Sequence, residues 1–167
     1  LFLFYIEARP ELGYLPDKSE EYRKGYSLES LRELEMIQLT TDESKNGFYL
    51  DESIKLLFGM LYDGHPKQGK AVNLDISGIG SEHHTFNILP LRSHLFDPKQ
   101  TPLLTKVKLR NSVMQEIIEL MSLSRPKQGR SQRRGRISYS QLGINQLGAV
   151  YEALLSYQGF FAETDLY

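Results

Sequence analysis

The sequence predicts an all-α, mainly helical fold. Four or five segments repeat apolar residues at the three- and four-residue spacing of amphipathic helices, and Pro, Gly or small polar residues stand near several of their ends. Alternating strand patterns are nearly absent, and residues 71–76 make at best one short strand. With 167 residues, of which 40% are hydrophobic, the chain is long enough to bury a sizeable core. We therefore expect residues 1–167 to form a single helical module, with at most a short strand pair and with irregular loops at about 65–101 and 124–137.

The first third of the chain predicts three helical segments. Residues 1–8 are apolar on nearly all sides, which indicates the end of a buried helix that Pro10 stops. Residues 20–26 predict a short helix, and Ser27 is the expected N-cap of the next one. Near-helical spacing in that next segment is shared by Leu28, Leu31, Leu34, Ile37 and Leu39.

Three further helices are expected. Asp51 is the predicted cap of a helix that ends at Gly64 and Pro66. Pro102 stands in the first turn of a long helix to about residue 123, with a buried side formed by Val107, Val113, Met114, Ile117, Ile118, Leu120 and Met121. The last helix spans about 144–157, and its apolar side comprises Leu147, Val150, Tyr151, Leu154 and Leu155.

Positive charge is concentrated in one stretch of twelve residues, 125–136, which we call the basic segment. It holds six of the 20 Lys and Arg and no acidic residue, so the other 14 basic residues stand against 21 acidic ones and leave the rest of the chain at −7. This asymmetry indicates a local patch for an anionic partner.

The composition also indicates the cellular compartment and excludes some kinds of chemistry. The chain has no cysteine, which excludes disulfides, thiol nucleophiles and cysteine-type zinc sites, and we expect a cytoplasmic location. The apolar opening LFLFYI is too short for a signal peptide or a membrane span. Because the chain starts without Met and stops at Tyr167 without a polar tail, it is expected to be a fragment of a larger protein.

The basic segment is the strongest chemical signal in the sequence. Its Pro and Gly residues predict an exposed loop that could follow a nucleic acid backbone, and a solvated linker is the alternative. Contacts would position the nucleic acid without reading bases, since no Asn or Gln recognition helix accompanies them. If all six cations contacted DNA, the slope of log K against log salt would be about −5. The candidate phosphate ligands are Arg125, Lys127, Arg130, Arg133, Arg134 and Arg136.

Other patterns are weaker and favour structural interpretations. Residues 72–81 end an apolar run in Asp75 and Gly-x-Gly, but no helix or βαβ unit follows, so we interpret them as a surface loop. His83, His84 and His94 lack the spacing of metal ligands, and no metal site is expected. Glu116 and Glu119 lie three apart on the long predicted helix.

Three stretches resemble one protein family. These are LFLFYIEARPELGYLP, HLFDPKQTPLL at 94–104, and RISYSQLGINQLGAVYEALLSYQGFFAETDLY at 136–167, whose LGxxxLGxxYExLL core is the most specific. They resemble the helical region upstream of the catalytic domain in large class I, S-adenosylmethionine-dependent DNA adenine methyltransferases. These are the Eco57I-like enzymes and the phage-defence (DISARM or BREX-like) enzymes.

The resemblance implies a module without catalysis of its own. The chain has no Pro-Pro dipeptide, and therefore lacks the adenine-binding motif of the family, which would be expected after Tyr167. No catalytic residue and no cofactor site is expected here, and S-adenosylmethionine would belong to the parent protein.

The implied partners are DNA, the catalytic methyltransferase domain of the same parent chain and other defence-system subunits, with no membrane. Docking of the catalytic domain would fall on Gly148, Ala149, Tyr151 and Glu152. A protein–protein interaction module of a defence complex is the alternative function, and a free-standing enzyme that uses the Gly78 loop or the histidines is a third.

Overall fold

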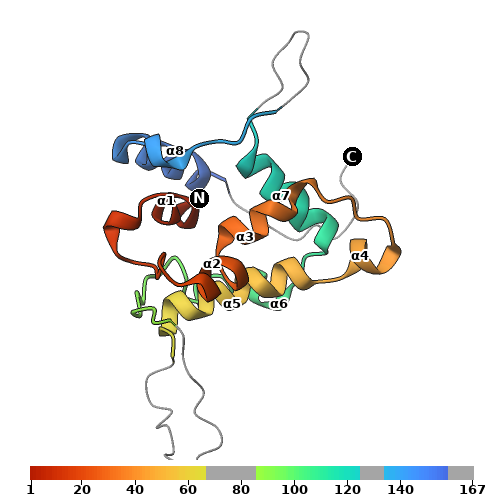
Figure 1. Ribbon diagram of the computed structural model, residues 1–167, viewed down its shortest axis with the longest axis horizontal. Helices are drawn as coiled ribbons and strands as arrows, with labels where there is room; N and C mark the ends of the chain where they lie inside the picture. Colours follow the sequence, from red (N-terminus) through yellow and green to blue (C-terminus); the bar gives the residue numbers. More distant parts are fainter. Residues whose placement is uncertain (67–85, 125–133, 158–167) are drawn as a thin grey trace, which may run out of the picture.

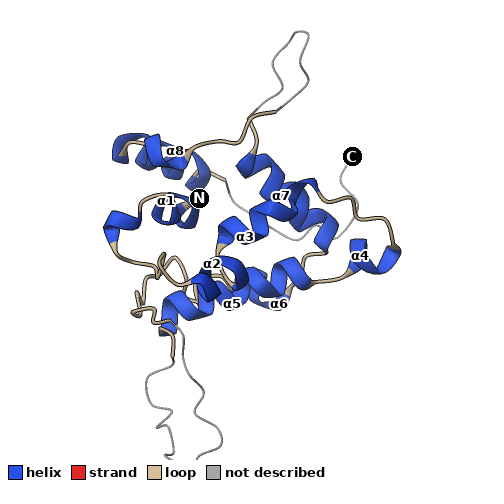
Figure 2. Ribbon diagram, in the orientation of Figure 1, coloured by secondary structure: helices blue, strands red, loops and turns tan. Residues whose placement is uncertain are grey.

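A computed structural model describes residues 1–66, 86–124 and 134–157, and over these ranges the chain is mainly helical and forms no β-sheet, so the predicted all-α class is confirmed (Figures 1 and 2). Two isolated antiparallel bridges, His65 with Ile88 and Leu123 with Arg136, are the β-pairing found there. The α-helices are α1 (Phe2–Glu7), α2 (Glu20–Gly25), α3 (Leu28–Arg32), α4 (Asp42–Asn46), α5 (Tyr49–Asp63), α6 (Pro102–Lys106), α7 (Asn111–Ser122) and α8 (Ile144–Leu155). The 3₁₀ helices are η1 (Pro10–Leu12), η2 (Glu33–Met36) and η3 (Tyr139–Gln141).

The core lies where α1, α3, α5 and α7 meet. Helix α7 packs on α3, η2, α4 and α5, and α1 packs on α3 and η3 (Figure 1). Leu57 and Leu61 of α5 are fully buried and Tyr22 of α2 nearly so. A fully buried leucine contributes about 2 kcal/mol relative to an exposed one. These three side chains are among the most deeply buried of the described core.

The N-terminal predictions hold in part, because the helix predicted from Leu28 to Leu39 ends before Ile37, which is 52% exposed. Leu3, Phe4 and Ile6 of α1 are buried, and α1 ends before Pro10. Ser27 caps α3 because its hydroxyl accepts a hydrogen bond from Ser30 N at 3.1 Å. The regular turns of α3 stop at Arg32, and the chain continues as the 3₁₀ helix η2 to Met36.

Asp51 does not cap α5, contrary to the prediction. The helix begins at Tyr49, two residues earlier, and Asp51 is a buried first-turn residue that pairs with Lys55 at 2.7 Å. Lys55 Nζ also donates to Val107 O at 2.6 Å, so Asp51 orients a lysine that joins α5 to the segment between α6 and α7. The predicted end at Gly64 is confirmed, where φ of +86° is a conformation that glycine adopts without strain.

The long helix predicted from Pro102 is two helices, α6 and α7, separated by residues 107–110. Asn111 explains the interruption, because its Oδ1 accepts from Leu50 N at 3.0 Å and its own N–H donates to Gly47 O at 2.7 Å. Residues far away in the sequence therefore fix the start of α7.

Part of the predicted buried side of this region is exposed. Met114 and Ile118 of α7 face the core, as predicted, whereas Val113, Ile117 and Leu120 are exposed, with Leu120 the most exposed at 66%. The apolar stripe of α7 is wider than the surface that η2, α3, α4 and α5 cover. One side of α7 is thus left uncovered within the described residues.

Helix α8 lies at the edge of the molecule above α1 (Figure 1). Leu147 is its one buried residue, and Tyr151 is half-buried against the core cluster. Leu154 and Leu155 are exposed, the latter at 80%.

The described part of the chain contains no helix with both the length and the apolar character needed to cross a membrane. The short strand considered at 71–76 lies outside the described residues.

Candidate nucleic-acid interface

The two residues that precede the basic segment, Leu123 and Ser124, lie beside its last residues at the end of α7. Leu123 and Arg136 form an antiparallel bridge, and Ser124 N donates to Gly135 O at 2.8 Å. The oxygen of the Ser124 side chain also accepts from Gly135 N at 3.2 Å. These contacts form a short stem, residues 122–124 with 134–137, that fixes where the basic segment leaves the helical body.

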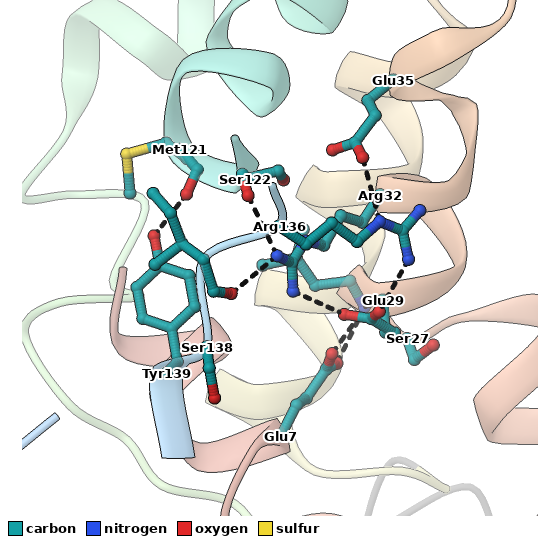
Figure 3. Close-up of polar contacts among 12 residues, drawn as sticks. Glu7, Ser27, Glu29, Arg32, Glu35, Met121, Ser122, Arg136, Ser138 and Tyr139 are labelled. Atoms are coloured by element: carbon teal, nitrogen blue, oxygen red, sulfur yellow. Dashed lines mark hydrogen bonds and ion pairs between the residues drawn. The ribbon is translucent and has the colours of Figure 1, made fainter. Parts of the chain in front are cut away.

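A buried arginine lies beneath the stem. The Arg32 side chain, 8% exposed, donates to Ser122 O at 3.1 Å and to Ile137 O at 2.8 Å, so one guanidinium holds both strands of the stem (Figure 3). It also pairs with Glu29 at 3.1 Å and lies over the Phe4 ring, 5.5 Å from its centre. Because burying an unpaired charge is costly, these contacts make Arg32 the anchor of the stem.

Arg136 is tied to two carboxylates of α3 and η2. Its Nε donates to Glu35 at 3.1 Å, and its Nη1 lies 3.4 Å from Glu29 (Figure 3). The Glu35 side chain is 1% exposed, and its second oxygen has no partner among the described residues. Removing the partner of a buried charge costs roughly 3–5 kcal/mol. Arg136 therefore stabilises the folded chain by compensating the buried charge of Glu35.

Arg134 is held more loosely. Its Nη1 pairs with Glu119 of α7, and its Nε donates to Ser124 O at 3.0 Å. The two side chains of the pair are 27% and 37% exposed. An ion pair in this setting contributes about 0–1 kcal/mol, since water and salt screen it.

Tyr139 closes the stem on the side facing α1. Its hydroxyl donates to Met121 O at 2.5 Å (Figure 3). Its ring stacks on Phe4, with 5.0 Å between the ring centres. Burial raises the pKa of Tyr139 above its ordinary value. The neutral phenol is thus the form that donates to the end of α7.

A second polar cluster lies at the start of α3. Glu7 accepts hydrogen bonds from Tyr22 Oη at 2.8 Å, from Leu28 N at 2.7 Å and from Glu29 N at 2.9 Å. Desolvation nevertheless raises the pKa of Glu7 above its ordinary value. Glu7 borders a surface cavity of 570 Å³ that Arg23 and Glu33 also line. With all three bonds directed to the protein itself, Glu7 serves as a cap that joins α1 to α3.

The predicted phosphate ligands divide into two groups. Arg134 and Arg136 lie in the stem and are ion-paired, whereas Arg125, Lys127, Arg130 and Arg133 lie outside the described residues. The structure thus assigns local partners to two of the six cations.

Of the predicted docking residues of α8, some are exposed and one packs on the core. Gly148, Ala149 and Glu152 are exposed, and a Cβ added at Gly148 would meet no atom within 4 Å. Tyr151 instead packs on the protein's own core cluster. The small-residue side of α8 is therefore open, while Tyr151 holds the helix in place.

The weaker patterns gain no support as sites. Residues 72–81, with His83 and His84, lie outside the described residues, and within the described ranges no group of His, Cys, Asp and Glu could hold a metal ion. His94 lies exposed in the loop before α6.

Arg32 and Glu35, whose side chains bind the stem, were not predicted from the sequence, although a signal was present. They stand four and seven residues after Leu28, on the side of the helix where apolar residues are expected. Charged residues of opposite sign in such positions indicate a buried pairing network. Glu119 was noted only for its spacing from Glu116, and its partner Arg134 is distant in sequence.

Comparison of the chain with protein-family models, with curated proteins and with solved structures returned no match.

Proposed function

We propose that this chain is a helical, DNA-contacting module of an S-adenosylmethionine-dependent DNA N6-adenine methyltransferase from a cytoplasmic restriction-modification or phage-defence system. Methyl transfer belongs to a separate catalytic domain, which supplies the S-adenosylmethionine site, and this module holds DNA beside it. The methyltransferase part of the proposal rests on the sequence resemblance of three stretches.

One observation carries the DNA contact: a segment with six cations and no acid is joined to a helical body by the stem, through residues 122–124 before it and 134–136 at its end. The bridge between Leu123 and Arg136 and the bonds from Arg32 fix its exit point. A phosphate backbone is a ligand of matching charge, and contacts of this type position DNA without reading its sequence. The four cations between the stem strands are the proposed phosphate ligands.

Binding of a fluorescein-labelled 20-base-pair duplex, measured by anisotropy at 50 mM salt, tests this function. The test variant replaces Arg125, Lys127, Arg130 and Arg133 with Gln. The control variant removes the same charge from exposed sites elsewhere, at Arg23, Lys45, Lys99 and Lys106. We expect the test variant to lose at least tenfold in affinity and the control to lose less than threefold. Equal losses in the two variants would contradict a local DNA site.

A protein–protein interaction module of a defence complex is the second candidate function. It is favoured by α8, where Ile144, Leu154 and Leu155 are largely exposed and Glu152 is the single charged residue. A pull-down of the other subunits of the defence complex with wild type and with the Leu154→Ser/Leu155→Ser variant tests it. Loss of capture in the α8 variant, with capture retained in the basic-segment variant, would favour this function over DNA contact.

A further inference from the structure

We propose that Glu119 withholds Arg134 from the DNA backbone, so that Arg134 is a fifth phosphate ligand that wild-type protein does not use. The inference rests on the proposed DNA-binding function and assigns separate roles to the two stem arginines. Both lie where the basic segment joins the helical body, and both are cations that a phosphate could attract.

The geometry allows Arg134, but not Arg136, to exchange its carboxylate partner. Glu35, the partner of Arg136, is 1% exposed and has a second oxygen without a partner among the described residues. Taking Arg136 away would leave a buried, uncompensated charge. Glu119 is 37% exposed, so water can solvate its carboxylate when Arg134 leaves.

The contacts of Arg134 also place it for this role. The bond from its Nε to Ser124 O does not involve Glu119, so it holds the guanidinium beside the stem in the Glu119→Gln variant as well. A phosphate and a carboxylate accept hydrogen bonds from arginine in the same way, and they therefore compete for it. Glu119 on α7 already pairs with Arg134 in the free protein, so a phosphate must displace this carboxylate before it can bind the arginine.

Glu116 provides a matched control on the same helix. It stands three residues before Glu119, is exposed, and has no ion pair within the described residues. Changing either acid to Gln removes the same charge from nearly the same place. The general electrostatic effect on DNA binding is therefore alike in the two variants, and the release of Arg134 is specific to Glu119→Gln.

The experiment is a salt titration of duplex binding for wild type, Glu119→Gln, Glu116→Gln, Arg134→Ala and the Glu119→Gln/Arg134→Ala double variant. We expect Glu119→Gln to steepen the slope of log K against log salt by about 0.9, the value for one added phosphate contact. Between 50 and 200 mM salt this corresponds to an extra loss of about 3.5-fold in affinity. Glu116→Gln, Arg134→Ala and the double variant should keep the wild-type slope.

Two results would overturn the inference. If Glu119→Gln and Glu116→Gln gave the same slope, Glu119 would not withhold a ligand. If Arg134→Ala lowered the wild-type slope, Arg134 would already contact DNA. A wild-type slope of zero would instead remove the proposed DNA-binding function itself, so the two failures are distinguishable. An amide-exchange measurement at Ser124 checks that the stem stays formed in each variant.

Discussion

Arg134 and Arg136 carry the same charge two positions apart, but their carboxylate partners differ in exposure. Arg136→Ala leaves Glu35 buried without its cation, and we expect a loss of roughly 2–3 kcal/mol in the free energy of unfolding, below the full cost of a buried pair because Arg136 itself is half-exposed. Arg134→Ala should cost under about 1 kcal/mol. Urea unfolding of both variants makes the comparison. Adding Glu35→Gln to Arg136→Ala should recover part of the loss, and no recovery would contradict the role of the buried charge.

Glu7 predicts a pH dependence with a definite sign. Desolvation raises the pKa of Glu7 in the folded chain above its value in the unfolded chain, so between these two pKa values the folded state binds more protons. The contribution of Glu7 to stability is therefore fully present below the unfolded pKa near 4.5 and declines as pH rises through the folded pKa.

Glu7→Gln removes that titration. The variant loses one carboxylate oxygen that accepts from the start of α3, so it should be less stable than wild type at low pH. The difference in unfolding free energy between wild type and variant should then shrink as pH rises from 4 to 7. A difference that grows with pH, measured by urea unfolding in one set of buffers, would contradict the assigned direction.

Arg32 of α3 donates hydrogen bonds to both strands of the stem. Arg32→Met keeps an apolar chain of similar length but removes the donors to Ser122 O and Ile137 O. Hydrogen bonds from a charged donor contribute about 1.5–3 kcal/mol each, so we expect about 3 kcal/mol of lost stability. Hydrogen exchange should quicken most at the amides of Ser124 and Ile137, which pair across the stem. Arg23→Met, at an exposed site in α2, is the control and should leave both amides protected.

Helix α8 is attached at its middle and uncovered at its end. Leu147→Ala should cost about 2 kcal/mol, since it empties the one buried position of the helix, whereas Leu155→Ala should lie within about 0.5 kcal/mol of wild type. Thermal unfolding of the two variants tests this attachment. Equal effects would mean that the exposed end of α8 packs on the body in solution.

Sequence signals predicted those helix ends that depend on contacts between residues close together in the chain. Ser27 and Gly64 were found at helix ends because capping and left-handed backbone depend on a few neighbouring residues. The break before α7 escaped prediction because Asn111 is bonded to Gly47 and Leu50, which are more than 60 positions away. The exposed stripe at Ile117 was predicted as core for a related reason, because periodicity gives an apolar side but not how much of it a neighbour covers.

The same limit applies to the candidate site. Composition alone located the basic segment and its six cations. It could not tell which of these cations are ion-paired within the protein and which are left for an external anion. That division depends on Glu35 and Glu119, whose distances from Arg136 and Arg134 only the fold determines. Across the whole molecule, the helical body therefore sets how many of the cations remain for an external anion.

Counting those cations on DNA is the most direct test of the proposed DNA contact. The measurement is the dependence of duplex affinity on salt between 50 and 300 mM for the wild-type chain. With Arg134 and Arg136 retained by their carboxylates, four contacts remain, and the slope of log K against log salt should be about −3.6. A slope near zero, or one unchanged when Arg125, Lys127, Arg130 and Arg133 are replaced by Gln, would contradict it.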